Sequence, residues 1–559
     1  MRGAIAAYRK AAEVEPRYAP AWFNLGLGLR ALGDESGAIE ALRRAIEVGP
    51  DFAPAWQAFA DAFAKSRFVA WSAQAAADLT RVLQHPAIDP GPLAEAAASL
   101  LALDPAIAPL MREVPAGARL QAAAQPMLLA LIENALVPDP AFEAFLRALR
   151  ASLLAAWRNG AAPPAAVDLA CALAQQCFLN EYVWPESAAE AAGVARLADA
   201  ARAAPGVLEI ALLGAYRPLA AIPGLARPVG AGEPFRRLWR RQVEEPAEER
   251  GLRDAIEALT LIDDATSRAV QRQYEENPYP RWHRVPASLA TPFPLRRALR
   301  ELVPHVDPAR LRVPDAPEVL IAGCGTGYQS AITALRNPGA HPRGGSQPDE
   351  PRVRGAPRAR ARPRARALRA GRHPEARRAR RPLRLHRVRR RAAPPGRPGR
   401  RRQGARGPAP ARRGDEARAL QRARPAGRGR GAGADRAARS GRRSRGRARG
   451  AAARARTARG QPGRGAALGH DFYSASGARD LVLHVQEHRF TAAQLGDFLR
   501  ALGLELLGFE FGDPAVPAAY RQRFPDDPAG TALVNWARFE DERPEAFSGM
   551  YQFWAARAA

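Results

Sequence analysis

The chain begins with an apolar pattern that repeats every 34 residues. Each period holds two stretches with large and small apolar residues at helical spacing, separated by a turn. Counted from Ala19, one full period comprises Trp22, Leu25, Gly26, Leu29, Ala38, Leu42, Ala45 and Pro50. The flanking half periods comprise Ala4, Tyr8, Ala11 and Pro16 before it, and Trp56, Phe59, Ala60 and Phe63 after it. We therefore expect paired helices that approach closely at small residues, with large residues filling the gaps between pairs.

These positions resemble those of the tetratricopeptide repeat, whose units stack into a curved array. The resemblance implies that residues 1–67 bind a peptide or protein on a concave face. A purely structural cap for the helices that follow fits so short an array equally well. Because only the second half of the first period is present, Met1 falls inside a unit. This predicts a truncated gene model or a missing upstream unit, since a unit without its neighbour leaves an apolar face exposed.

Residues 68–255 are rich in alanine and leucine at helical spacing, which predicts an all-helical domain of short, paired helices. The expected helix breaks are Pro86, Pro90, Pro92, Pro105, Pro138, Pro163, Pro164, Pro185 and Pro205. Cys171 and Cys177 are separated by five residues and have no histidine nearby, so we expect buried free thiols in a helix rather than a zinc site. The following apolar run is interrupted by three polar residues that could line a pocket, Asn180, Glu181 and Tyr182.

Candidate chemistry begins near residue 270. The segment from Gln273 to Trp282 contains two prolines and three aromatic residues. It cannot continue a helix, and we expect an ordered turn lined by aromatic side chains. Its possible pocket residues are Tyr274, Asn277, Tyr279 and Arg281.

A glycine loop follows about 40 residues later. Residues 319–322 predict a short buried strand, residues 323–327 spell Gly-Cys-Gly-Thr-Gly, and residues 328–335 predict a helix. A nucleotide-type ligand needs this order, because glycines let the backbone come close and the helix N-terminus offers N–H donors. Some other strand, turn and helix fits the same short pattern.

Residues 341–470 differ from the rest of the chain in composition. They contain 42 arginines but no lysine, isoleucine, methionine, asparagine, cysteine, phenylalanine, tyrosine or tryptophan. Six acidic residues leave this segment with a charge of +36, whereas the whole chain carries +29, so the remainder is mildly acidic at −7. The basicity of the chain is therefore a property of one segment.

Three interpretations of this segment compete: an arm that binds nucleic acid, a disordered linker, and a stretch translated out of frame. Evolved basic arms usually mix lysine with arginine and interleave aromatic residues. Both are missing here, and the missing residues are mainly those with AT-rich codons, so we favour the out-of-frame interpretation. We expect no strands within 341–470, although its length suits the middle strands and helices of a doubly wound fold.

Regular patterning returns after residue 470. A helix is expected over Thr491–Leu502, ended by Gly503, and a strand over Leu504–Phe511. His484-Val-Gln-Glu-His488 matches the inverted zinc-protease motif, but five residues match by chance and no third ligand is identifiable, so we predict no metal. A solvated helix face or a polar pocket rim are the alternatives. The aromatic residues near the carboxyl end should pack against a sheet or cover a substrate: Trp536, Phe539, Phe547, Met550, Tyr551, Phe553 and Trp554.

The glycine loop after an apolar strand resembles motif I of class I S-adenosylmethionine-dependent methyltransferases. Together with the repeat, the Gln-Cys-Phe-Leu-Asn-Glu-Tyr run at 176–182 and the segment 273–282, it resembles bacterial repeat-containing methyltransferases of unassigned substrate. The resemblance implies S-adenosyl-L-methionine as cofactor, bound by Gly323, Cys324, Gly325, Thr326 and Gly327. Many class I enzymes place an acid two residues before the first glycine, where this chain has Ile321, so contacts to the cofactor's amino group must come from elsewhere.

The expected fold class is therefore a helical repeat and helical domain followed by an interrupted, Rossmann-like α/β methyltransferase domain. The expected boundaries are 1–67 for the repeats, 68–255 for the helical domain, 256–340 for the first part of the methyltransferase domain, 341–470 for the arginine-rich, disordered segment and 471–559 for the last part. Scattered cysteines and the lack of a long apolar stretch predict a cytoplasmic protein without a membrane partner.

The expected function is methyl transfer to an acceptor that the sequence does not identify, by catalytic residues that it does not identify either. Because the middle of the fold is interrupted, we expect this chain to bind the cofactor poorly or not at all. The alternative is a non-enzymatic repeat scaffold whose arginine-rich arm binds nucleic acid.

Overall fold

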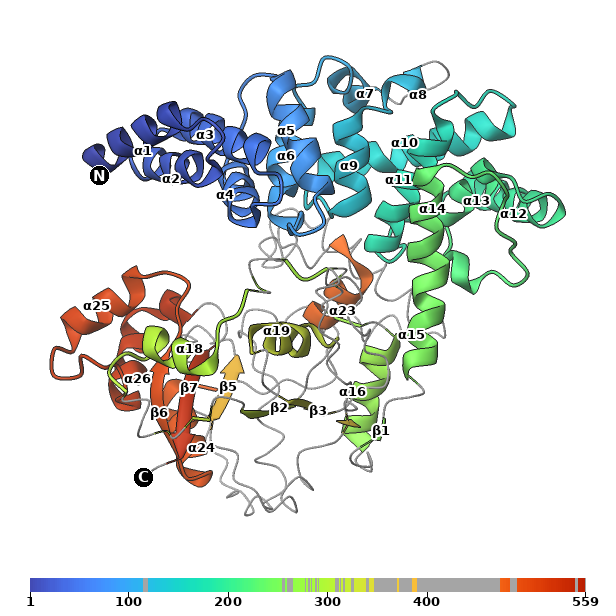
Figure 1. The fold of residues 1–559 in the computed structure, drawn as a ribbon. Coiled ribbons are helices and arrows are strands. Elements are labelled where there is room, and N and C mark those ends of the chain that lie inside the picture. The colour runs from blue at the N-terminus through green and yellow to red at the C-terminus, as the bar shows by residue number, and fades with distance from the viewer. Residues whose placement is uncertain are drawn as a thin grey trace. The chain divides into compact units, whose positions relative to one another are not determined.

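The computed structural model is mostly helical, with a few strands towards the carboxyl end (Figure 1). The residues that it describes are 1–113, 119–253, 257–258, 265–276, 278–279, 282, 284–286, 289, 291–306, 311, 313–314, 317–322, 326–337, 341–345, 369–370, 385–389, 473–482, 490–547 and 551–557. They fall into two compact units. Unit 1 contains residues 1–251 with the segments 282–290 and 473–481, and unit 2 contains the rest.

Unit 1 begins with four helices in the expected repeat register. They are α1 (Arg2–Val14), α2 (Ala19–Ala31), α3 (Glu35–Val48) and α4 (Ala53–Ala64). Between α2 and α3, Gly33 adopts a left-handed φ of 84°, and the Asp34 carboxylate caps α3 by accepting the Gly37 N–H at 2.9 Å. The predicted helical pairs are confirmed.

Tryptophan hydrogen bonds recur with the same period. The Trp22 indole donates to the Pro16 carbonyl at 2.9 Å, and 34 residues later the Trp56 indole donates to the Pro50 carbonyl at 2.8 Å. Each bond ties the first helix of a unit to the turn before it, whose carbonyl has no partner within a helix. The periodicity thus extends from apolar spacing to individual polar contacts.

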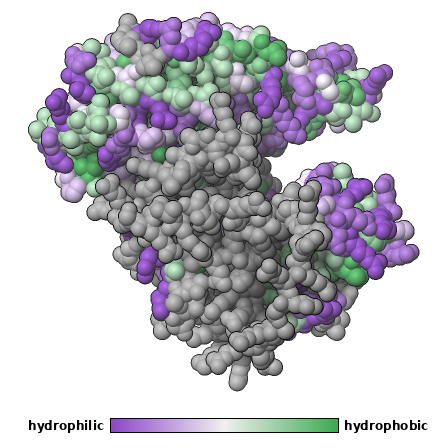
Figure 2. All heavy atoms as spheres, turned by 180° about the vertical axis from the view of Figure 1, so that it is seen from behind, coloured by the Kyte–Doolittle hydropathy of each residue, from purple (hydrophilic) through white to green (hydrophobic). Residues whose placement is uncertain are grey.

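The remainder of unit 1 is helical, as predicted. The helices of the predicted helical domain are α5 (Ala73–Gln84), α6 (Ala94–Leu101), α7 (Ala108–Arg112), α8 (Arg119–Ala122), α9 (Pro126–Asn134), α10 (Pro140–Arg158), α11 (Ala166–Leu179), α12 (Ala188–Ala203), α13 (Val207–Gly214), α14 (Glu233–Trp239) and α15 (Glu245–Arg253). A further helix of unit 1, α23 (Ala475–Val482), was not predicted and lies in the segment 471–559, which the sequence assigned to the methyltransferase domain. A π-helical turn, Arg240–Glu244, joins α14 to α15. The predicted proline breaks all lie outside α-helices, with Pro92 in the 3-10 turn Gly91–Leu93. The pale green of alanine-rich helices, interspersed with purple, covers much of the helical part on the face in Figure 2.

Both cysteines of α11 are buried free thiols, which confirms the prediction for them. Burial raises the pKa of the Cys177 thiol to about 11, although the Arg150 guanidinium acts in the opposite direction. Burial likewise raises the pKa of Cys171. Both side chains therefore behave as small apolar groups in the helical core.

The first half of unit 2 holds β1 (Glu257–Ala258), α16 (Ala265–Glu276), α18 (Leu295–Leu302), β2 (Glu318–Ala322), α19 (Tyr328–Arg336) and β3 (His341–Gly345). The predicted turn over 273–282 is wrong at its start, because α16 continues through Gln273 to Glu276. The helix ends only where Asn277 precedes Pro278, since the proline ring disfavours helical geometry in the residue before it. Strand β2 and helix α19 match the predicted strand and helix to within one residue.

The second half of unit 2 has a layered arrangement. Strand β7 (Gln552–Arg557) lies between β6 (Leu504–Phe509) and β5 (Leu385–Arg389) and is antiparallel to both. Helices α24 (Ala492–Ala501) and α26 (Leu533–Glu542) cover one face, and α18 packs on the other. Helix α25 (Ala515–Arg523) contributes Tyr520 to the first face.

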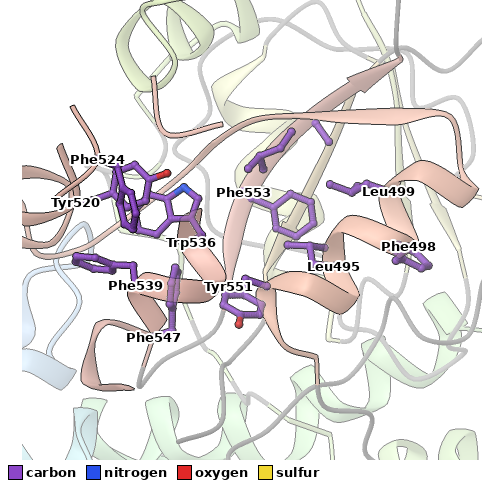
Figure 3. Packing of buried hydrophobic residues seen from close by; sticks show 13 residues of the cluster. Leu495, Phe498, Leu499, Tyr520, Phe524, Trp536, Phe539, Phe547, Tyr551 and Phe553 are labelled. Carbon is purple, nitrogen blue, oxygen red and sulfur yellow. The ribbon is translucent and has the colours of Figure 1, made fainter. Parts of the chain in front are cut away.

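Side chains of β7 alternate between these two faces. Phe553 and Ala555 pack into the cluster of α24 and α26, whereas Trp554 and Ala556 pack against α18. Figure 3 shows the first cluster, in which the Tyr520 ring stacks on the Trp536 indole with centroids 3.6 Å apart. The prediction that the aromatic residues pack against a sheet is confirmed for the described ones; Met550 lies outside the described residues.

The cap residues of α24 also match the sequence. Thr491 and Gln494 form a reciprocal capping box, and Gly503 ends the helix with a φ of 66°. The following strand ends at Phe509, two residues earlier than predicted. Its backbone pairing continues one step further, since the Glu510 N–H donates to the Gln552 carbonyl at 2.7 Å.

The strands assemble differently from the prediction. Among the described residues they form three separate sheets, β1–β4, β2–β3 and β5–β7–β6, rather than one doubly wound sheet. The expectation of no strand within 341–470 is also wrong, because β3, β4 (Arg369–Ala370) and β5 lie there. Strand β5 contains two of the few apolar residues of this segment, Leu385 and Val388. Its pairing with β7 is made by backbone N–H and carbonyl groups, which every residue except proline carries whatever its side chain.

Among the described residues, no helix combines the length and apolar character needed to cross a bilayer.

Candidate functional site

The end of the glycine loop lies between β2 and α19 in unit 2. Thr326 is buried at 5% exposure, and Gly327 is the N-cap of α19 with a left-handed φ of 77°. A side chain at position 327 would be strained in that conformation, which explains the glycine. Gly323, Cys324 and Gly325 lie outside the described residues.

A parallel strand completes this unit. β2 pairs with β3 from Glu318 opposite His341 to Ala322 opposite Gly345. The order β2, loop, α19, β3 is therefore a βαβ unit, with the loop at the carboxyl end of β2. Ligands of open α/β sheets bind at this edge.

The first turn of α19 offers hydrogen-bonding groups to a ligand. Gly327 provides no side-chain cap, so the N–H groups of the first turn receive no acceptor from the N-cap residue. The Ser330 hydroxyl in this turn is buried and has no hydrogen-bond partner among the described residues. A helix N-terminus with a spare hydroxyl favours an anionic or polar ligand group. Ser330 was not predicted as a site residue, since a serine in an amphipathic helix carries no distinguishing signal.

The predicted pocket residues of the aromatic segment are only partly described. Tyr274 is half-buried in α16 and Tyr279 is half-buried after it, both in unit 2. Asn277 and Arg281 lie outside the described residues.

Arg284, which the sequence did not single out, follows this segment and belongs to unit 1. Its guanidinium donates to the carbonyls of His85 and Ile88 at 2.9 and 3.3 Å and to Asn134 Oδ1 at 2.8 Å. Burial, together with the charge of Arg241, lowers its pKa from the usual high value. These three acceptors come from two separate stretches of the helical domain and hold the Arg284 side chain in place.

The polar run after α11 forms an unusual helix end. The Tyr182 N–H donates to the Cys177 carbonyl at 2.8 Å, and the Glu181 N–H donates to the Phe178 carbonyl at 3.2 Å. This is the Schellman pattern, in which the residue at position 181 is left-handed and usually glycine. Here Glu181 and Tyr182 both have a φ of 58°. Non-glycine residues in this region cost about 1–2 kcal/mol each, so other contacts must hold the turn.

Those contacts come from α23 and from the helical core. The Ala475 N–H donates to the Asn180 carbonyl at 3.3 Å, and the Ser476 N–H donates to the Glu181 carboxylate. A carboxylate at a helix N-terminus is favourable because of the N–H groups there. The Tyr182 hydroxyl lies 3.2 Å from the Gly214 carbonyl and 3.1 Å from Gln242 Oε1.

The Asn180 side chain adds a polar group beneath this turn. Asn180 is 1% exposed, and neither atom of its carboxamide has a hydrogen-bond partner among the described residues. The structure thus brings the three predicted residues, Asn180, Glu181 and Tyr182, into one turn. The Asn180 carbonyl and the Glu181 carboxylate join α11 to α23, and the Tyr182 hydroxyl joins it to the core.

A buried charge network lies next to this turn. Arg150, 2% exposed, donates to Glu190 Oε1 at 3.1 Å and to the Pro185 carbonyl at 3.0 Å, and its guanidinium lies 4.2 Å from the Tyr216 ring centroid. The Tyr216 hydroxyl lies 3.1 Å from the same Glu190 oxygen. Burial acts to raise the pKa of Glu190, but the Ser187 N–H and the charge of Arg150 outweigh it and hold that pKa below its usual value. These contacts tie α10 to α12 within the helical core.

The inverted zinc-protease motif, His484 to His488, lies outside the described residues. Within the described part of the chain, no group of three or more histidine, cysteine, aspartate or glutamate side chains is placed to hold a metal ion.

Comparison with known proteins identifies one region. The model of the tetratricopeptide repeat family matches residues 19–62, which cover α2, α3 and most of α4. No curated protein matches the chain. The repeat is therefore established by both the sequence and the packing, and such repeats are typical of protein–protein interaction.

Proposed function

We propose that this chain combines a protein-binding tetratricopeptide repeat with the beginning of a class I methyltransferase domain. Intact proteins of the family that this chain resembles would transfer a methyl group from S-adenosyl-L-methionine to an acceptor held by the helical part. The supporting observation is the βαβ unit, with left-handed Gly327 at the N-terminus of α19 and the spare hydroxyl of Ser330 in the first turn.

The described residues fit one end of such a cofactor. Gly327 and Thr326, with the first turn of α19, would hold its methionine end through backbone N–H groups, and Gly323, Cys324 and Gly325 would complete the loop. When bound, this cofactor supplies a methyl group on a positively charged sulfur. The ribose end fits poorly, because β3 ends on Gly344 and Gly345, which offer no carboxylate to the ribose hydroxyls.

We therefore propose that the chain as it stands binds the cofactor weakly or not at all. Calorimetric titration of the full chain with S-adenosylhomocysteine tests this proposal. No heat above dilution is expected up to millimolar ligand, and micromolar binding would refute it. If binding occurs, a Gly327→Val variant shows whether the loop is responsible, because a branched side chain cannot adopt the left-handed N-cap conformation.

The interruption itself has a separate test. We propose that residues 341–470 are translated out of frame, because 42 arginines occur there without a single lysine. Sequencing the gene across codons 335–475 in independent isolates should reveal a compensating pair of frame changes. An uninterrupted frame in those isolates would overturn this proposal.

A second candidate function rests on the +36 charge of the same segment. In this alternative the repeat is a scaffold, and a genuine arginine-rich arm binds nucleic acid through its phosphates. A preference for one nucleic acid that persists at 200 mM salt and disappears on deletion of 341–470 would favour it. Methyl transfer that survives the same deletion would favour the enzyme.

A further inference from the structure

Two arginines of unit 1, Arg241 and Arg284, are held at the carboxyl end of α9 without a carboxylate partner. The Arg241 guanidinium donates to the Glu133 carbonyl at 2.8 Å, and the Arg284 guanidinium donates to Asn134 Oδ1 at 2.8 Å. Both side chains are half-buried. Among the described residues, every hydrogen bond of these two groups goes to a neutral oxygen. Because buried charges are normally paired, this arrangement leaves positive charge uncompensated.

A paired arginine of the same unit shows the difference. Arg43 donates to the Asp78 carboxylate at 2.8 Å. Burial acts to lower the pKa of Arg43, but Asp78 outweighs it and holds that pKa above its usual value. Burial instead lowers the pKa of Arg241, and burial together with the charge of Arg241 lowers the pKa of Arg284. Arg284 is therefore charged close to a second positive group, without an acid in contact to compensate.

The acidic side chains near these two arginines are used elsewhere. The Glu133 carboxylate accepts the Arg237 guanidinium through both oxygens, at 2.6 and 3.0 Å. Glu245 pairs with Arg240 at 3.4 Å. Asp89 is exposed and forms no ion pair with a described residue. All three acids attract Arg241 or Arg284 from a distance, but none of their carboxylates touches either guanidinium.

Helix ends compensate for only part of the charge. The carbonyl of His85, which is the C-cap of α5, accepts Arg284 at 2.9 Å, and the Glu133 carbonyl lies in the last turn of α9. A helix carboxyl end carries about half a negative charge, so these two ends offer about one negative charge to two positive groups. A guanidinium has five N–H donors. Donors and positive charge thus remain available on Arg241 and Arg284.

We propose that Arg241 and Arg284 together bind an oxyanion, the phosphate or carboxylate group of a ligand of the helical domain. Guanidinium groups present parallel N–H donors that match two oxygens of either anion. Both side chains keep some exposure, so a ligand group can reach them from solvent. The bound anion supplies the missing negative charge and thereby stabilises the helical domain. This inference does not depend on methyl transfer or on the cofactor.

Thermal unfolding of the full chain, followed by circular dichroism, tests the proposal. The probes are inorganic phosphate and acetate, each at about 10 mM with ionic strength held constant by chloride, so that general salt effects stay small. The protein is compared as wild type, Arg241→Gln, Arg284→Gln and Arg240→Gln. Arg240 is the matched control, because it lies in the same π-helical turn as Arg241 and its side chain is 65% exposed. The arginine-rich segment is present in every form, so anions bound there contribute equally.

Either anion should raise the Tm of wild type and of Arg240→Gln by at least about 2 °C. Arg241→Gln and Arg284→Gln should lose this shift. Without added anion, Arg241→Gln should be at least as stable as wild type, because it removes a half-buried charge that has no acidic partner.

A purely structural role at the end of α9 predicts the opposite result, a lower Tm for Arg241→Gln and the same anion response in all forms. That outcome, or no shift of the wild type with either anion, would overturn the proposal. A larger shift with phosphate than with acetate assigns a ligand that carries a phosphate group, and the reverse order assigns a carboxylate.

Discussion

Glu181 occupies a left-handed position at the end of α11 where most helices have glycine. Its carboxylate accepts the Ser476 N–H at the start of α23. Replacement by alanine removes that contact and keeps the backbone strain, whereas replacement by glycine removes both. We expect Glu181→Ala to be less stable than Glu181→Gly by about 1 kcal/mol, because alanine resists a positive φ that glycine adopts freely.

The measurement is the urea concentration at half unfolding, followed by circular dichroism. Alanine at Ala204, the C-cap of α12, has an extended φ of −147°, so Ala204→Gly is a control in which glycine should not stabilise. Equal stability of Glu181→Ala and Glu181→Gly would show that position 181 is not held in a left-handed conformation.

The buried pair of Arg150 and Glu190 predicts a dependence on pH. The folded pKa of Glu190 lies below its usual value. Its contribution to stability is therefore present above the unfolded pKa, about 4.3, and is lost as the pH falls through the folded value. We expect Glu190→Gln to lower the free energy of unfolding by about 3 kcal/mol at neutral pH, because the Arg150 charge loses its partner. The glutamine can still accept the Ser187 N–H.

Urea titrations of wild type and Glu190→Gln between pH 3 and pH 7 check this prediction. The difference between them should shrink as the pH falls below about 4. Asp199→Asn is the matched control, because Asp199 pairs with Arg202 at the surface with its side chain 78% exposed. A difference between wild type and Glu190→Gln that stays constant over this range would contradict the assignment.

At the scale of elements, the spacing of α2 and α3 depends on Gly26. A Cβ there would lie 2.7 Å from Leu42 Cγ and 3.2 Å from the Ala38 carbonyl oxygen. We expect Gly26→Ala to destabilise the repeat by about 1–3 kcal/mol, since overpacking forces neighbouring atoms to move. Gly3→Ala in α1 meets nothing within 4 Å and should be neutral or slightly stabilising, because alanine favours helices. Thermal unfolding of the two variants distinguishes packing from helix propensity.

Helix ends that are set by nearby residues, such as caps and prolines, could be predicted from the sequence. Thr491, Gln494 and Gly503 fix both ends of α24 through contacts within a few residues, so their pattern was sufficient. Prolines separated the helices of unit 1 for the same reason, since each acts on its own neighbours. The expected turn over 273–282 began too early because three polar residues before Asn277 still favour a helix.

Residues whose roles depend on distant contacts could not be predicted. Arg284 is bound by His85, Ile88 and Asn134, which lie at least 150 residues away in the chain. Glu181 meets Ser476 across 295 residues. In both cases the sequence around the residue contains no information about which distant residue it contacts. The Ser330 hydroxyl near the glycine loop was missed because a polar residue in an amphipathic helix is ordinarily solvated.

At the scale of the whole molecule, charge is divided very unevenly along the chain. Residues 341–470 carry +36 and the remainder carries −7. A segment translated out of frame has had no selection for a particular nucleic acid, so its affinity for polyanions should come from charge alone. A recognition arm would instead add contacts to bases, through which one sequence or strand type is preferred.

This difference gives the last prediction. We expect the full chain to bind duplex DNA, single-stranded RNA and heparin with similar affinity when compared at equal charge density. The affinity for DNA should fall by about a thousandfold or more between 50 and 200 mM salt, because each arginine that neutralises a phosphate releases a counterion. Fluorescence anisotropy with competing polyanions measures both quantities. A strong preference for one nucleic acid that persists at 200 mM salt would contradict the out-of-frame interpretation, since base contacts that resist salt require a selected arrangement of side chains.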